Sequence, residues 1–281
     1  MFFKRFEKCL IGLLTLAIFA VIATVAAYAG ILGTKHDLSV TGPGPIKATV
    51  VTERCVFCHT PHGGNTGVYP LWNHQLSTAT YVGAQQGTAP FPTLLSPKGW
   101  GTTGGTGIWQ AIGDKPDGGA KLCLSCHDGT VAIGAVFNTP GRGSTGSITM
   151  TDSGTGLLTG GGALATASAG YLGTNFVTAG YIKHPFSIVF DNNLVADKII
   201  QCSPPNCQTS MALQLPTDPA VQLKPTSNTY RGNTGLGVQC RTCHDPHDNV
   251  RGAFLVKGNP SPGDNSPLCD TCHILCPNIC M

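Results

Sequence analysis

Four short stretches of this chain place two cysteines three positions apart, with a histidine directly after the second cysteine. The spacing C-x-x-C-H is the attachment sequence for c-type haem. Two thiols so spaced can reach the two vinyl groups at one edge of a porphyrin, and the adjacent histidine then lies under the ring, where it ligates the iron. The cysteine pairs are Cys55 and Cys58, Cys123 and Cys126, Cys240 and Cys243, and Cys269 and Cys272, and the histidines are His59, His127, His244 and His273.

The same cysteine pairs could instead form disulfides, or two zinc sites of four thiolates each. Neither alternative explains why a histidine follows every pair. The chain has 9 histidines in 281 residues, so chance would place one at a given position only about once in 30. The motifs, which we call the first to fourth haem motifs in chain order, therefore predict four covalently attached haems with their irons.

The sixth ligand of each iron decides whether the site carries electrons or binds a substrate. Four distal ligands are needed, and five histidines remain outside the motifs, so one of them is a bystander. Iron closed by two histidines does not bind substrate directly and favours electron transfer. We therefore expect an electron carrier and not an enzyme, with no catalytic residues. The candidate distal ligands are His36, His62, His74, His184 and His247.

Two of these candidates follow a haem motif at the same short distance. His62 lies three residues after His59, and His247 lies three residues after His244. Three residues cannot reach around a porphyrin to its opposite face. Each of the two histidines therefore ligates the iron of a different haem, or none.

The beginning of the chain has the pattern of an export signal. Positive charges at Lys4, Arg5 and Lys8 precede an apolar run, and Ala27-Tyr28-Ala29 matches a cleavage site. We expect residues 1–29 to be removed and residues 30–281 to form an exported tetrahaem domain. The alternative is that the apolar run stays uncleaved as a membrane anchor, since 18 apolar residues are just long enough to span a bilayer.

Four further cysteines of the expected mature chain lie outside the haem motifs, and a fifth, Cys9, lies in the signal segment. An oxidising compartment makes two disulfides the expected outcome, and a zinc site built from all four is the alternative. The spacing leaves the connectivity open. These residues are Cys202, Cys207, Cys276 and Cys280.

The composition predicts an irregular fold. The chain holds 37 glycines and 20 prolines, which favour turns over long helices. We expect mostly coil, with short helices around the haem motifs, a few short strands and a core built largely by haem. Residues 138–180 are rich in Gly, Ser and Thr and are expected at the surface. The net charge is only +3 and no basic cluster follows the N-terminus, so nucleic-acid binding is not expected.

Five islands of sequence carry a family resemblance: residues 35–39 (KHDLS), 55–62 (CVFCHTPH), 71–74 (LWNH), 184–185 (HP) and 240–247 (CRTCHDPH). Together they resemble exported multihaem c-type cytochromes with doubled CXXCH motifs, and more narrowly the tetrahaem extracellular cytochrome filaments, or nanowires. The resemblance implies a continuous chain of haems with two histidine ligands each. It also implies head-to-tail polymerisation, in which one axial histidine comes from the neighbouring subunit. On this sequence the best donor is His36, near the mature N-terminus.

The expected function is thus electron transport along an extracellular conductive filament at the cell surface, with redox proteins or extracellular acceptors as partners. The alternative is a monomeric periplasmic tetrahaem shuttle. A membrane-anchored quinol oxidase subunit would need the N-terminal helix to stay uncleaved. A haem enzyme such as a nitrite or hydroxylamine reductase would need an open iron.

Overall fold

The structure is a computed structural model of the 281-residue chain. It describes residues 30–66, 68, 71–81, 116–140, 146–174, 176–178, 181–182, 184, 186–199, 211–230, 233–258 and 267–275. The expected signal segment and the four cysteines outside the haem motifs lie outside these residues.

Short elements joined by coil make up the described chain, as the composition predicted. The helices are α3 (Gly118–His127), α4 (Asn192–Ile199), α5 (Cys240–Cys243) and the 3-10 helix η2 (Cys269–Thr271). The strands are β1 (Lys47–Ala48), β2 (Ala135–Val136), β3 (Gly146–Ser147), β4 (Met150–Thr151), β5 (Val177–Thr178), β6 (Tyr181–Ile182), β7 (Ile188–Val189), β8 (Met211–Leu213), β9 (Lys224–Tyr230), β10 (Asn233–Val238) and β11 (His273–Leu275).

The strands pair only into small antiparallel sheets. The pairs are β1 with β4, β2 with β3, β5 with β6, and β8 with β11, while β7, β10 and β9 form a three-stranded sheet in that order. Gly237 in β10 permits the approach to β7, since a Cβ there would lie 1.9 Å from the backbone oxygen of Ile188. A side chain at this position would therefore separate the two strands.

Three small clusters of buried apolar side chains lie in the described residues, and each includes part of a haem motif. Phe57, from the first motif, is buried with Ala48, Val136 and Ile148. A second cluster gathers Leu124 of the second motif with Ala120, Phe176 and Phe186, and Cys240 of the third motif packs against it. The third cluster lies around β7, α4 and β10, with Cys272 of the fourth motif against it. The apolar packing is thus divided among the haem motifs.

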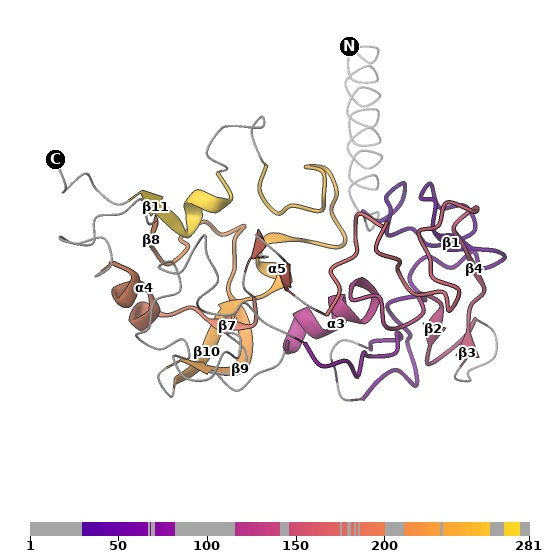
Figure 1. The fold of residues 1–281 in the computed structure, drawn as a ribbon, viewed down its shortest axis with the longest axis horizontal. Coiled ribbons are helices and arrows are strands. Elements are labelled where there is room, and N and C mark those ends of the chain that lie inside the picture. Colours follow the sequence, from indigo (N-terminus) through magenta and orange to yellow (C-terminus); the bar gives the residue numbers. More distant parts are fainter. Residues whose placement is uncertain are drawn as a thin grey trace, which may run out of the picture.

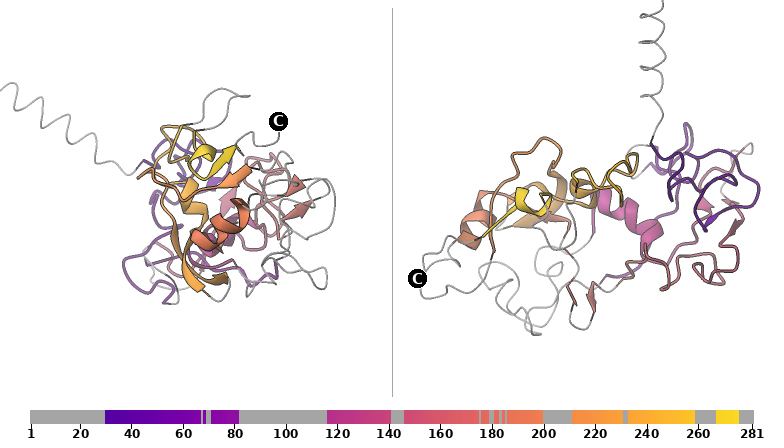
Figure 2. Two further views of the ribbon diagram at one scale, coloured as in Figure 1. Left: turned by 90° about the vertical axis from the view of Figure 1, so that its left-hand side faces the viewer. Right: turned by 90° about the horizontal axis from the view of Figure 1, so that it is seen from above.

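The elements are spread along the long axis of the molecule (Figure 1). The sheets β1–β4 and β2–β3 lie at one end, α3 and α5 lie near the middle, and β11, β8 and α4 lie at the other end. The view from above shows the same sequence of elements along the long axis (Figure 2). The elements that carry the second, third and fourth motifs therefore follow one another in space as they do in the chain.

The Gly/Ser/Thr-rich segment was expected at the surface, and the structure corrects this in part. Ile148, Ala163, Leu164 and Phe176 are buried, with between 2% and 6% of their surface exposed. The segment adds β3, β4 and β5 to the sheets. Its glycines allow tight turns, and its few apolar side chains complete the packing around the first and second motifs.

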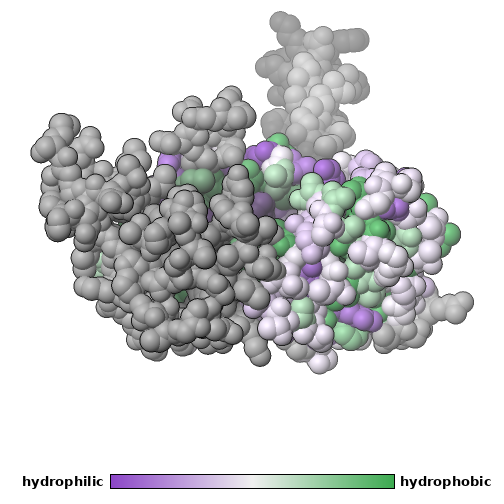
Figure 3. All heavy atoms as spheres, viewed as in Figure 1, coloured by the Kyte–Doolittle hydropathy of each residue, from purple (hydrophilic) through white to green (hydrophobic). Residues whose placement is uncertain are grey.

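Polar and apolar side chains alternate over the face that the described residues present in Figure 3, with strongly hydrophilic residues isolated from one another. This agrees with a chain in which only 11% of residues are charged. Within the described ranges, no helix combines the length and the hydropathy that a membrane span requires.

Candidate haem sites and their histidines

Each of the four haem motifs includes a helical turn, which brings its two cysteines to one side of the backbone. In the first motif, the amide of His59 donates to the carbonyl of Cys55 (2.7 Å). The second motif forms the last turns of α3, the third forms α5, and the fourth begins η2. The expectation of short helices around the motifs is confirmed for the second, third and fourth motifs, while the first forms a single hydrogen-bonded turn.

A buried polar bridge joins the helices of the second and third motifs. Gln239, which is 1% exposed, caps α5 and also accepts a hydrogen bond from the amide of Ala120 in α3 (3.1 Å). Its amide nitrogen donates to Oδ1 of Asp117, the residue before α3 (2.7 Å). Gln239 therefore caps α5 and also binds one N-terminal amide of α3, so that one residue joins the two helices.

The motif thiols form a spatial series in chain order. Cys58 of the first motif lies close enough to Cys126 and Cys123 that burial, and then these two thiolates, raise its pKa. Cys123 and Cys240 share a side-chain hydrogen bond. In the fully reduced protein all eight motif cysteines are free thiols.

The series continues to the fourth motif. Burial, followed by the thiolates of Cys272 and Cys269, raises the pKa of Cys243 to about 11. The cysteine pairs of successive motifs are thus neighbours, from the first motif to the fourth.

Three of the five candidate distal histidines face a motif histidine. The ring centroids of His36 and His127 lie 6.1 Å apart, with 63° between the ring planes. His59 and His247 are 6.1 Å apart at 25°, and His184 and His273 are 6.2 Å apart at 85°. Each pair joins one distal candidate to one motif histidine.

This separation fits an iron between the rings. A metal–imidazole bond of about 2.0 Å and about 1.1 Å from that nitrogen to its ring centre, counted on both sides, give about 6 Å. The angle between the ring planes varies freely about the nitrogen–iron–nitrogen axis, so all three angles are compatible. The residues present therefore fit haem iron at the second, first and fourth motifs.

The outer nitrogens of two motif histidines are already bound to backbone carbonyls. Nδ1 of His127 lies 2.7 Å from the oxygen of Gly170, and Nδ1 of His244 lies 2.9 Å from the oxygen of Ala253. A metal-ligating histidine ordinarily donates its second N–H in this way, which fixes the ring and leaves the other nitrogen for the metal. Nδ1 of His273 is buried without a hydrogen-bond partner in the described protein, a costly state unless another group binds it.

Burial keeps several of these rings neutral, which is the form that ligates metals. It lowers the pKa of His36, with the neighbouring His127 acting in the same direction. Burial also lowers the pKa of His127, although the Gly170 carbonyl opposes it. For His273, burial and then His184 lower the pKa.

The two remaining candidates differ in kind. His74 is fully buried, and its two ring nitrogens lie 2.8 Å from the carbonyl of Gln75 and 3.1 Å from that of Ala132. Both nitrogens therefore lie against backbone carbonyls, and the neutral ring donates to one of these carbonyls at a time. His62 is exposed, and only its carbonyl is held, by Thr60 and Asn138. No ring contact joins either of them to His244, the exposed third-motif histidine, among the described residues.

Sequence reasoning missed the polar residues that hold the ligands. Asp37 and Arg54 form an ion pair beside His36, and Asp117 and Gln239 join two motif helices. The adjacency of Asp37 to a distal candidate and of Arg54 to Cys55 was the only local signal. Gly170 gave none, because its contact with His127 depends on tertiary structure.

Compared with models of known protein families and with curated proteins, the chain matches none.

Proposed function

We propose that the chain is a tetrahaem c-type cytochrome that carries electrons along a row of haems with two histidine ligands each. The observation that carries this proposal is the set of three histidine pairs at 6.1–6.2 Å, each joining a motif histidine to a distal candidate. An accidental histidine cluster would not select one motif member and one non-motif member three times. The neighbouring motif thiols support a continuous row.

Bound haem iron supplies a one-electron couple. The chain's own residues would hold it: eight thiols would attach the four haems, and two histidines per iron would ligate it and leave no site there for a substrate. The carbonyls of Gly170 and Ala253 orient two of the motif histidines. The pairing assigns His247 to the first haem, His36 to the second and His184 to the fourth.

The third haem has no distal histidine of its own under this pairing. We assign this place to His62 of a second copy, because His62 is exposed, whereas His74 is fully buried with both ring nitrogens against backbone carbonyls. The surplus histidine is then His74. A contact in which each copy donates one ligand and receives one is heterologous and continues into a filament. His36, the donor that the resemblance implies, faces His127 of its own chain instead.

Electron microscopy and the visible spectrum of the purified holoprotein test this function. We expect filaments in which all four haems are low-spin and do not bind carbon monoxide. His62→Ala should give single particles with one high-spin haem in four. His36→Ala should also produce one high-spin haem, yet still form filaments.

Other outcomes separate the alternatives. Single particles of the native protein with four low-spin haems would support the monomeric periplasmic shuttle. Filaments that survive His62→Ala and are lost in His36→Ala would return the donor role to His36. Carbon monoxide binding by two or more haems of the native protein would contradict an electron carrier with closed irons.

A further inference from the structure

We propose that Asp37 and Arg54 act as a positioning clamp, which couples the distal ligand of the second haem to the attachment site of the first. The inference rests on the proposed pairing of His36 with His127. Asp37 directly follows His36, and Arg54 directly precedes Cys55. Each partner of the ion pair is thus the sequence neighbour of a haem-site residue, so the pair connects the two proposed haem sites directly.

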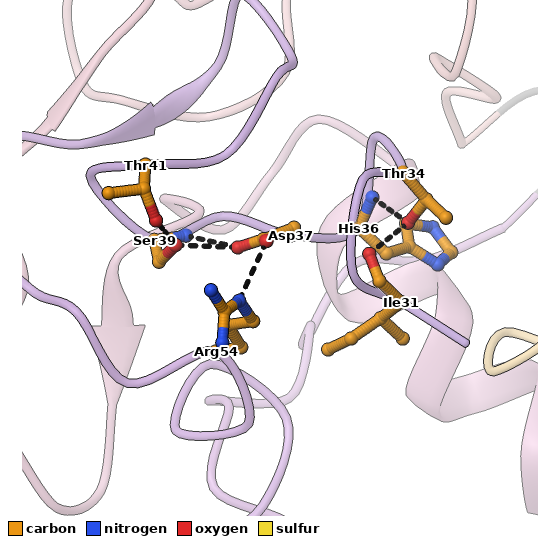
Figure 4. A network of polar contacts seen from close by, with 7 residues as sticks. All are labelled: Ile31, Thr34, His36, Asp37, Ser39, Thr41 and Arg54. Carbon is orange, nitrogen blue, oxygen red and sulfur yellow. Dashed lines mark hydrogen bonds and ion pairs between the residues drawn. The ribbon is translucent and has the colours of Figure 1, made fainter. Parts of the chain in front are cut away.

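The carboxylate of Asp37 is 1% exposed and is held by three groups (Figure 4). Its Oδ2 accepts a hydrogen bond from Nε of Arg54 at 2.9 Å. Its Oδ1 accepts one from the hydroxyl of Ser39 at 2.6 Å and one from the amide of Ser39 at 3.2 Å. A buried carboxylate is costly unless it is paired and hydrogen-bonded in this way.

The backbone around Asp37 is fastened to the strand-like segment before the first motif. The amide of Val40 donates to the carbonyl of Val51, and the amide of Ala48 donates to the carbonyl of Leu38. Gly42 closes the turn: a Cβ at this position would lie 1.8 Å from the carbonyl oxygen of Asp37. The direction in which the chain leaves Asp37 is therefore fixed.

His36 is held more weakly on its other side. Its ring stacks on Phe254 at 4.1 Å with 14° between the planes, and its Nδ1 is 3.5 Å from the carbonyl of Pro246, a long contact. An apolar stack leaves the ring free to slide in its plane. The clamp at the next residue supplies the restraint that this contact lacks.

The charges of the pair also matter for the first haem. Arg54 is 42% exposed and lies next to the first thioether cysteine, while its partner carboxylate is buried. Removing the carboxylate's charge leaves a positive group beside Cys55. A positive charge near an iron favours its reduced form, so the potential of the first haem should rise when Asp37 is neutralised.

Asp37→Asn in the holoprotein tests the clamp, with electron paramagnetic resonance and a redox titration as measurements. We expect part of the low-spin signal, up to that of one haem in four, to become high-spin. Added imidazole should restore it, because the free ligand replaces a displaced His36. In the redox titration, the reduction potential of the first haem should shift upward. Asp152→Asn is the matched control, since Asp152 accepts hydrogen bonds from the amides of Gly154 and Leu157 in a separate turn.

Arg54→Gln keeps the test decisive if Asp37→Asn folds poorly. This substitution removes the charge of the partly exposed partner, Arg54, and leaves the hydrogen bonds from Ser39 to the buried Asp37 in place. We expect Arg54→Gln to give the same high-spin signal, which added imidazole again removes. Arg54→Lys keeps the positive charge but lacks the Nε donor, so we expect it to restore the low-spin signal only in part. A normal low-spin spectrum in both Asp37→Asn and Arg54→Gln, while His36→Ala becomes high-spin, would overturn the clamp and keep the pairing. An unchanged spectrum in His36→Ala would overturn the pairing itself.

Discussion

The ring of His59 lies opposite the ring of His247, with centroids 6.1 Å apart, although His59 is part of the first haem motif and His247 follows the third. His59 is the proposed iron ligand of the first motif, and His247 lies in the loop after the third. Under the proposed function, a histidine too close to its own motif to ligate that haem ligates a different one. The proposed pairing would then join residues 59 and 247, which are far apart in the sequence, through one iron.

Replacing His247 with alanine should open the first haem alone. Without its distal ligand, the iron becomes high-spin and binds carbon monoxide, so we expect one carbon monoxide per tetrahaem chain. Spectrophotometric titration of the reduced protein measures this number. Binding of no carbon monoxide would contradict the assignment of His247 to an iron.

The substitution His74→Gln should leave every haem low-spin. His74 is fully buried and both its nitrogens lie against carbonyls, so its loss costs buried hydrogen bonds and not a ligand. We expect the free energy of unfolding to fall by about 1–3 kcal/mol. Thermal denaturation measures the stability and electron paramagnetic resonance the spin state; a new high-spin signal would identify His74 as a ligand.

Gln239→Ala should loosen the junction between the second and third motifs. The substitution leaves the amide of Ala120 and the carboxylate of Asp117 without their shared partner. Ala120 keeps its bond to the carbonyl of Asp117, and the Asp117 carboxylate keeps its bonds from Thr226 and Ser227. We therefore expect the loss of the Gln239 hydrogen bonds to cost about 1–3 kcal/mol and to lower the thermal midpoint. The haem content should stay at four per chain, as measured by the pyridine haemochrome assay. Gln222→Ala, at an exposed glutamine, serves as the control and should change neither quantity.

Acid should destabilise the same junction. Burial alone would raise the pKa of Asp117, but hydrogen bonds from Ser227, Gln239 and Thr226 outweigh it and hold the pKa below the usual value. A carboxyl with a lowered pKa in the folded state contributes stability above its unfolded pKa, near 4, and loses that contribution as pH falls through the folded value.

We therefore expect the thermal midpoint of the native protein to fall below about pH 4 more steeply than that of Asp117→Asn, which carries no titrating group there. Circular dichroism melts between neutral pH and about pH 3 make the comparison. Equal slopes in the two proteins would show that Asp117 does not stabilise the fold by its charge.

The local features of this protein could be predicted from its sequence because they depend on neighbouring residues. The haem motifs, the short helical turns that carry them and the prevalence of coil follow from cysteine spacing and from glycine and proline content. The set of five candidate distal histidines could also be named, because each is a histidine outside a motif. Burial within the Gly/Ser/Thr-rich segment could not, since it depends on what packs against Ile148 and Phe176.

Only the tertiary structure decided which histidine faces which motif. A distal ligand needs its ring within about 6 Å of a partner far away in sequence, and local patterns carry no information on such distances. The structure placed His36 opposite His127, buried His74 with both ring nitrogens against carbonyls and left His62 exposed. Of the five candidates, three lie opposite a motif histidine, His74 is buried in the protein and His62 is exposed. These histidines have the same chemistry, and only their burial and their contacts in the folded chain distinguish them.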